Sequence, residues 1–366
     1  MATIIDSHVH CFPPLGATEN VTHQQLTELQ HHVRFHSQGI TRVKDGCKVE
    51  SPLLAGDKDG ASFMPDLNFR IGRFGKLEFT HKNEDYYMQW YPADFENMSI
   101  SPELMISQMD YAEVDRGVIQ HDRIYGRLDN FLSDCVNKYP DRFIALAQVN
   151  EWEGGSEDQL ERVRHQIEDL NHSGLYFSTG GFFHCDFQMG INDKSLKPLW
   201  DLVIELDIPI HWYAAKIRKP FPEDYLEEIR DLIQWAETYP EIRSILTHGL
   251  NNVHYDIGKP YRFSVPPEII TLLNFPKWHM ELMLHLMAGD LEFPPHEKGL
   301  EDIIKSLVSE VGPEKLVWGS DMPACERTLT YKQSLILLND RCDFLTSQER
   351  NMILGENLNR IYPLHI

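Results

Sequence analysis

The sequence predicts an α/β fold, a (β/α)8 (TIM) barrel that carries a long insertion after its first strand. Three observations lead to this prediction: short apolar segments recur along the chain, helical patterns lie between them, and residues 11–101 fit neither pattern. Short, near-continuous apolar segments are typical of strands that are buried on both faces of a parallel sheet. Strands of this kind that alternate with helices indicate a barrel or an open doubly wound sheet.

Eight segments have the character expected of barrel strands. They are residues 3–6, 117–120, 143–149, 174–177, 208–212, 244–248, 280–284 and 315–319. Apolar side chains recur at steps of three and four, as on one face of a helix, in residues 157–171, 224–237 and 300–311. A glycine-rich phosphate loop, Gly-x-Gly-x-x-Gly, does not follow the first segment, and this favours the barrel over the open sheet, which remains the alternative.

Residues 11–101 are interpreted as an insertion within a single barrel domain that spans 1–366. The stretch contains Pro13-Pro14, many charges and the aromatic cluster 86–91. Loops at the C-terminal face of a barrel surround its active site, so we expect the insertion to form a lid there. Tyr87 and Trp90 could then close over a ligand. The alternative is a peripheral decoration with no role at the site.

Composition and charge exclude several classes of protein. Of the 366 residues, 42% are hydrophobic and 25% are charged, which is ordinary for a globular protein and excludes a mostly disordered chain. The formal net charge of −22 argues against binding a nucleic-acid backbone. No apolar run approaches the roughly 20 residues that a membrane span needs. The N-terminus lacks the features of a secretory signal, so we expect a cytoplasmic protein with no membrane or nucleic-acid partner.

Candidate metal ligands follow the apolar segments. His8 and His10 are separated by one residue, and residues i and i+2 of an extended chain point the same way. His211 and His248 lie at the ends of later segments, and Asp321 lies just past the last one. Strand ends meet at the mouth of a barrel, where imidazole and carboxylate groups together suit zinc, manganese or iron. For each residue alone, a hydrogen-bonded histidine or a capping aspartate is the alternative.

These residues carry a resemblance to a known family. The sequence resembles the amidohydrolase superfamily, and within it the amidohydrolase-2 group, which includes aminocarboxymuconate-semialdehyde decarboxylase. The similarity extends from Asp6-Ser7-His8-Val9-His10 to the closing helix at 351–361. The resemblance implies a metal-dependent enzyme, a hydrolase or a decarboxylase (lyase). It would use a divalent metal and activated water for hydrolysis, or the metal for non-oxidative decarboxylation of a small carboxylated substrate.

The resemblance also implies roles for individual residues. His8, His10, His211 and Asp321 would bind one divalent metal, for which zinc is expected. His248 would sit beside the metal-bound water as general base or electrostatic activator, and Asp321 would share in catalysis. The physics agrees with these roles, because a bound metal lowers the pKa of water toward about 7 and histidine titrates near 6.5.

A dinuclear site is the alternative use of the same residues. In that arrangement His211 and His248 hold a second metal, and an iron or manganese pair is expected. Dinuclear members often need a bridging lysine or glutamate after the fourth strand, and 174–179 offers neither. His121 and Glu151, which follow the second and third segments, could complete the second site, or could hydrogen-bond the substrate or the other ligands.

The dinuclear arrangement leads to two further readings. One is an iron or manganese oxygenase, similar in this respect to the two-subunit 2-aminoisobutyrate hydroxylase. The other is a metal-binding subunit that supports a related catalytic chain. The resemblance also implies a homo-oligomer or pairing with a related chain.

The expected substrate is a small carboxylic acid. Arg123 is the candidate residue to bind its carboxylate, because a guanidinium group can donate two parallel hydrogen bonds to a carboxylate. Trp212 is the candidate pocket wall. A solvated surface charge and a core tryptophan are the respective alternatives.

Overall fold

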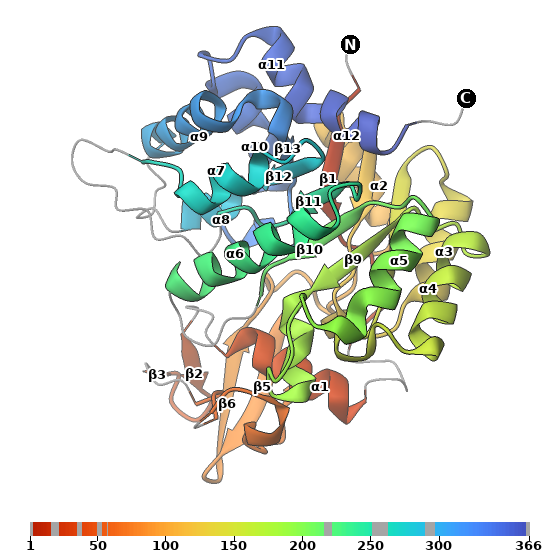
Figure 1. Cartoon of the computed structure of the whole chain (residues 1–366). Helices are drawn as coiled ribbons and strands as arrows, with labels where there is room; N and C mark the ends of the chain where they lie inside the picture. The colour runs from red at the N-terminus through yellow and green to blue at the C-terminus, as the bar shows by residue number, and fades with distance from the viewer. Residues whose placement is uncertain are drawn as a thin grey trace.

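The computed structural model describes residues 3–15, 22–34, 39–49, 53–56, 58–215, 222–250, 263–289 and 297–363. Eight parallel strands form one sheet, and in spatial order they are β1 (Ile5–Val9), β7 (Arg116–Ile119), β8 (Phe143–Gln148), β9 (Gly174–Ser178), β10 (Ile210–Tyr213), β11 (Ser244–Leu246), β12 (Trp278–Leu282) and β13 (Leu316–Trp318). Each coincides with or overlaps one of the eight segments expected to be strands. The predicted (β/α)8 barrel is therefore confirmed (Figure 1).

The first and last strands of the barrel meet just beyond their regular hydrogen bonds. Val9 forms a parallel bridge with Met322, the backbone N–H of His10 donates to the Met322 carbonyl at 2.9 Å, and that of Asp321 donates to the His8 carbonyl at 2.9 Å. The closure of the barrel thus runs through residues that the sequence predicts to be metal ligands.

Helices surround the barrel strands. They are α2 (Pro102–Ala112), α3 (Asp129–Lys138), α4 (Glu157–Glu168), α5 (Lys197–Glu205), α6 (Pro222–Thr238), α7 (Pro267–Leu273), α8 (Leu284–Gly289), α9 (Glu297–Val311), α10 (Tyr331–Ile336), α11 (Ser347–Asn351) and α12 (Asn357–Ile361). The three helical patterns seen in the sequence correspond to α4, α6 and α9. Local chemistry sets their ends: Ser101 caps α2 by accepting a hydrogen bond from the Leu104 amide, with Pro102 in the first turn.

Short helical turns connect these elements. They are η1 (Ala61–Phe63), η2 (Arg123–Tyr125), η3 (Glu151–Glu153), η4 (Thr179–Cys185), η5 (Lys194–Leu196), η6 (Pro313–Lys315), η7 (Ala324–Arg327), η8 (Leu337–Arg341) and η9 (Met352–Glu356). Three of them, η2, η3 and η4, follow directly on strands β7, β8 and β9. They therefore lie at the C-terminal end of the barrel, where the strands deliver their site residues.

Alternation along the strands divides the core into two parts. On β10, Tyr213 belongs to the cluster inside the barrel, together with Val118 and Tyr176, whereas Trp212 packs outside against the helices with Trp235. Side chains of a strand point to opposite faces in turn, so neighbouring residues of β10 enter different cores. This alternation decides which predicted residues reach the site.

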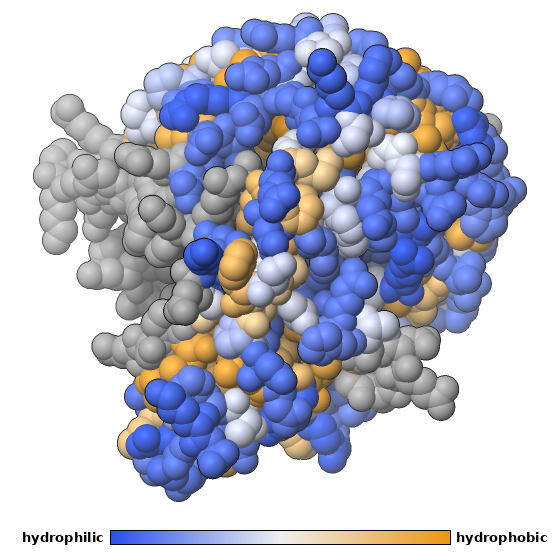
Figure 2. All heavy atoms as spheres, turned by 60° about the horizontal axis from the view of Figure 1, so that its bottom comes forward, coloured by the Kyte–Doolittle hydropathy of each residue, from blue (hydrophilic) through white to orange (hydrophobic). Residues whose placement is uncertain are grey.

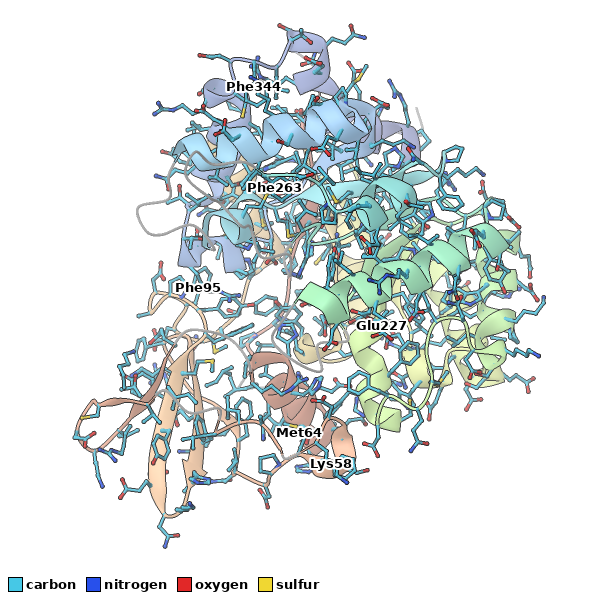
Figure 3. The ribbon with its side chains drawn as sticks, turned by 60° about the vertical axis from the view of Figure 1, so that its left-hand side comes forward. Lys58, Met64, Phe95, Glu227, Phe263 and Phe344 are labelled. Atoms are coloured by element: carbon cyan, nitrogen blue, oxygen red, sulfur yellow. The ribbon has the colours of Figure 1, made fainter. Side chains whose placement is uncertain are left out.

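The insertion consists of α1 (His23–Val33) and a small antiparallel sheet. The strands of that sheet are β2 (Ile40–Arg42), β3 (Lys48–Val49), β4 (Arg70–Ile71), β5 (Lys76–His81) and β6 (Glu84–Gln89), in the spatial order β3-β2-β6-β5-β4. An antiparallel bridge between Phe12 and Ile100 joins the two ends of the insertion. Figure 1 shows the insertion at the end of the barrel away from the two termini, and Figure 3 shows α1 between the small sheet and the barrel.

The face of the molecule that Figure 2 shows is mainly hydrophilic. Figure 2 views the end that carries the insertion, where apolar residues gather near the junction with the barrel. Exposed large apolar side chains in the insertion include Val43, Phe63 and Phe74. Within the described ranges, no helix is both long and apolar enough to cross a bilayer.

Candidate metal centre

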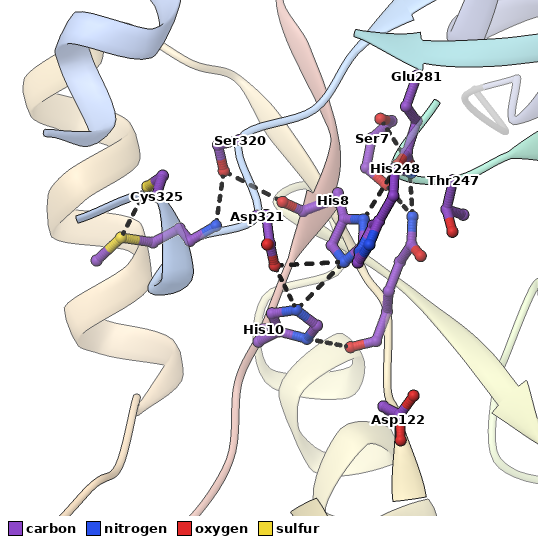
Figure 4. Close-up of polar contacts among 12 residues, drawn as sticks. Ser7, His8, His10, Asp122, Thr247, His248, Glu281, Ser320, Asp321 and Cys325 are labelled. Atoms are coloured by element: carbon purple, nitrogen blue, oxygen red, sulfur yellow. Dashed lines mark hydrogen bonds and ion pairs between the residues drawn. The ribbon is translucent and has the colours of Figure 1, made fainter. Parts of the chain in front are cut away.

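His8, His10 and Asp321 come together at the mouth of the barrel (Figure 4). Strand β1 places both histidines on the same side, with their Nε2 atoms 3.2 Å apart. The Asp321 Oδ1 atom lies 3.0 Å from His10 Nε2 and 3.7 Å from His8 Nε2. Asp321 has a φ of 58°, a left-handed conformation that is uncommon outside glycine and often marks functional positions.

The other ring nitrogens show why these Nε2 atoms suit a cation. His10 Nδ1 lies 2.9 Å from the backbone carbonyl of Gln120, which can only accept a hydrogen bond, so Nδ1 carries the proton. His8 Nδ1 lies 3.1 Å from Glu281 Oε2, and burial lowers the pKa of His8 well below its ordinary value. Both Nε2 atoms therefore present lone pairs to each other and to a carboxylate. A divalent cation would match this donor set.

His248 lies beside this group. It follows β11 with a φ of 60°, and its ring centroid lies 5.0 Å from that of His8 and 4.2 Å from that of Tyr213. One ligand atom each from His8, His248 and Asp321 lie within 4.8 Å of one another. Burial lowers the pKa of His248 well below its ordinary value, so the imidazole is neutral and can accept a proton or bind a cation.

A further histidine, which sequence reasoning missed, contacts Asp321. His285 in α8 is buried, and its Nε2 atom lies 3.2 Å from Asp321 Oδ2. Burial alone would raise the pKa of Asp321, but the imidazole groups of His10, His285 and His8 around the carboxylate outweigh it and hold the pKa well below its usual range. Asp321 is therefore ionised, as a metal ligand needs to be.

Glu281 on β12 is a second residue that sequence reasoning missed. Its buried carboxylate accepts hydrogen bonds from Ser7 Oγ at 2.9 Å, Gln120 Nε2 at 2.6 Å and the His248 amide at 3.1 Å, in addition to its contact with His8. Burial raises the pKa of Glu281 to about 8. The signal in the sequence was a single charged residue inside the apolar segment 280–284.

His211 and Trp212, which were predicted to be ligand and pocket wall, lie elsewhere. His211 Nδ1 is 3.0 Å from Gln120 Nε2, its Nε2 is 2.9 Å from the Tyr362 hydroxyl, and burial lowers its pKa to about 3. Its register partner on β11 is Ile245, three residues before His248, so it lies deeper in the barrel. Trp212 points outward into the core, where its Nε1 donates to Ser244 Oγ at 3.1 Å.

His121, Arg123 and Glu151 also engage partners outside the cluster. His121 Nε2 contacts the Gly126 carbonyl at 2.6 Å, and burial lowers its pKa to about 4. Glu151 accepts a hydrogen bond from the Ser178 amide at 2.9 Å and pairs with Arg123. Arg123 also binds Glu28 of α1, with Nε 3.2 Å from Oε1. Of the predicted ligands, the structure thus brings together His8 and His10 with His248 and Asp321.

The fold and the site together define a class of protein. It is a (β/α)8 barrel in which histidine and carboxylate groups meet at the C-terminal ends of the first, sixth and eighth strands. A family model described as Amidohydrolase (Amidohydro_2) matches residues 5–364. The chain therefore belongs to this amidohydrolase family, a family of enzymes, and the resemblance seen in the sequence is confirmed.

Solved structures share the fold at low sequence identity. A probable 2-pyrone-4,6-dicarboxylic acid hydrolase from Acinetobacter baumannii, with citric acid bound, is 18% identical with a TM-score of 0.55, over 75% of this chain and 92% of that chain. An amidohydrolase from Burkholderia multivorans with bound zinc is 14% identical with a TM-score of 0.55, over 73% and 90%. A structure described as amidohydrolase II is 15% identical with a TM-score of 0.52, over 98% and 99%. No curated protein sequence matches the chain.

Proposed function

We propose that this chain is a metal-dependent enzyme that hydrolyses or non-oxidatively decarboxylates a small carboxylated substrate. One observation carries the proposal: the Nε2 atoms of His8 and His10 lie 3.2 Å apart and face the carboxylate of Asp321, while their Nδ1 atoms are committed to other partners. Such a set of converging lone pairs is stabilised by a cation. The bound zinc in the Burkholderia multivorans relative agrees with zinc as the metal.

The division of roles follows from the geometry. His8, His10 and Asp321 would hold the divalent cation, which supplies Lewis acidity and lowers the pKa of a bound water. His248, kept neutral by burial, would accept the proton from that water or from the substrate. Glu281 would fix the His8 ring through Nδ1 and the His248 backbone through its amide.

A single cation is favoured over a pair. The second site of the dinuclear alternative pairs His211 with His248, and His121 or Glu151 would complete it. In the described parts of the chain, however, His211, His121 and Glu151 contact Tyr362, Gly126 and Ser178 respectively. The oxygenase and supporting-subunit readings depend on that second site or on a partner chain, and neither has a specific observation in its favour. Self-association through the barrel remains a proposal.

The insertion is proposed to act as a lid over this centre. The His32 ring of α1 lies 6.3 Å from the Tyr213 ring, which itself packs on His248, and 5.5 Å from the Trp90 ring. Glu28 of the same helix pairs with Arg123, which follows β7. These contacts of α1 with residues at the C-terminal end of the barrel support the proposal, because a lid there would exclude water from the reaction.

Elemental analysis of the purified protein is the test of this proposal. We expect one divalent ion per chain, loss of that ion in His8→Ala and Asp321→Ala, and retention in His211→Gln, the matched control for a buried histidine outside the cluster. His248→Ala should keep the ion and lose turnover of small carboxylic acids, assayed by carbon dioxide release and by hydrolysis. Full retention of metal in both ligand variants would overturn the site. Two ions per chain, with one lost in His248→Ala, would restore the dinuclear alternative.

A further inference from the structure

Arg327 is carried by the same segment as Asp321. It is the last residue of η7, and two hydrogen bonds connect this turn to the centre. The Cys325 amide donates to the Asp321 carbonyl at 3.1 Å, and the side-chain hydroxyl of Thr328 donates to the His285 carbonyl at 3.4 Å. The loop after the eighth barrel strand therefore delivers both a carboxylate and a guanidinium group. Residues in this position face the active site in barrel enzymes.

The guanidinium group of Arg327 is held by aromatic rings of the insertion. It lies 4.3 Å from the centroid of Trp90 and 5.7 Å from that of Tyr91. Stacking of this kind orients the plane of the group and leaves its edge, with the N–H donors, available for hydrogen bonds. Both rings are buried, at 3% and 1% exposure, so the support is rigid.

Arg327 has no acidic partner among the described residues. No carboxylate there lies within 4.0 Å of its guanidinium nitrogens, and its Nε atom is buried without a hydrogen-bond partner. Two other sheltered arginines do have acidic partners: Arg123 pairs with Glu28 and Glu151, and Arg162 pairs with Asp129 at 2.8 Å. A buried donor without an acceptor is costly, and its acceptor is commonly a ligand.

The surroundings connect Arg327 to the centre. Tyr91 shares a hydrogen bond of 2.8 Å with the hydroxyl of Tyr125, whose ring lies 5.0 Å from that of His10. Burial raises the pKa of Tyr91 to about 12, and the charge of Arg327 opposes that rise. The same charge acts on Tyr213, which packs on His248. Arg327 therefore lies close enough to the aromatic rings that contact His10 and His248 for its charge to act on them.

We propose that Arg327 is the substrate-carboxylate anchor of this site. It would bind the carboxylate side-on through Nε–H and one Nη–H, while Trp90 holds the guanidinium plane. This inference rests on the proposed function and deepens it, because it assigns the carboxylate of the substrate to one residue. It also replaces Arg123, whose donors are engaged by two glutamates of the protein itself.

Ligand binding to the purified full-length protein tests the anchor. The probes are benzoate and glutarate, with benzamide and glutaramide as uncharged analogues of the same shape, measured by titration calorimetry. We expect Arg327→Gln to weaken carboxylate binding at least tenfold and amide binding less than twofold. Arg327→Lys should fall between, because lysine keeps the charge and loses the fork. Arg73→Gln is the matched control, since Arg73 also stacks on a ring, that of Phe74, but lies on the outer surface.

Several outcomes would overturn the anchor. They are equal binding of carboxylates by wild type and Arg327→Gln, an equal loss for acids and amides, and no saturable carboxylate binding by the wild-type protein. If Arg327→Gln fails to fold, the Arg327→Lys variant and Trp90→Phe, which keeps a stacking ring, supply the same comparison. Metal content separates the two proposals: Arg327-dependent binding in a protein without metal would remove the proposed function and leave the anchor standing.

Discussion

Two groups of histidines and carboxylates lie at the C-terminal end of this barrel, and they differ in one respect. The first group joins α1 to the turns η2, η3 and η4. It contains Glu28, Glu151 and His184, and Arg123 lies between the two glutamates as an internal cation. The group at the barrel mouth, around His8 and Asp321, has no lysine or arginine partner among the described residues. The group without a cation of its own is therefore the candidate metal site, and the group that contains Arg123 is a structural ion-pair network.

Removal of Arg123, the internal cation of the first group, is expected to have the largest effect on the free energy of unfolding. Arg123→Met removes the guanidinium group that Glu28 and Glu151 share, and breaking a buried pair in this way costs about 3–5 kcal/mol. Urea unfolding should show that loss in the free energy of unfolding. The half-exposed pair of Arg70 with Glu78 is the control, and Arg70→Met should cost less than about 1 kcal/mol. Similar losses in the two variants would mean that the buried network is not held by its charges.

Glu281→Gln tests the second group, at the mouth of the barrel, through its affinity for metal. The substitution replaces the carboxyl group that His8 Nδ1 faces with an amide, and loss of such a partner typically lowers metal affinity 10–100-fold. Competition with a chelator measures this affinity, while the thermal midpoint should change little. Ser7→Ala removes one donor to the same carboxylate and should change affinity by less than about threefold. An unchanged affinity in Glu281→Gln would show that His8 is positioned without this residue.

The smallest expected effect is that of His121 on the pH dependence of stability. This effect shows whether His121 belongs to the metal centre or to the structural network. Burial lowers its pKa to about 4 in the folded protein, so it is neutral, whereas in the unfolded chain it takes up a proton near pH 6.5. Its contribution to stability is therefore present above pH 6.5 and is lost as the pH falls toward 4. Between pH 7 and 5 it accounts for about 2 kcal/mol of lost unfolding free energy.

The variant His121→Gln should flatten that part of the pH profile and keep the full metal content. Unfolding in urea at a series of pH values, together with elemental analysis, measures both quantities. Loss of metal in this variant would place His121 in the centre, as the sequence first suggested, and not in the structural network.

The sequence predicted the barrel because each strand carries its own signal. An apolar segment such as 143–149 can be recognised as a strand from its own residues. Eight such segments along the chain together predict the barrel. His8, His10 and Asp321 could also be predicted as site residues. The C-terminal ends of the strands of a barrel converge at its mouth, whatever the exact register of each strand. The depth of a residue in the barrel is different, because it depends on the register between strands. His211 lies at the level of Ile245, three residues before His248. The pairing of Glu28 with Arg123 joins residues far apart in sequence, and no local pattern reports it.

The seam of the barrel passes through the candidate metal centre, and this has a consequence for biogenesis. His8 and Asp321 come from opposite ends of the chain, and the backbone hydrogen bond between them is also the one that closes the barrel. During synthesis the first histidines leave the ribosome long before their carboxylate partner. The candidate cation site is thus complete only after the chain has been made through the eighth barrel strand and the barrel has closed, so a bound cation would report that closure.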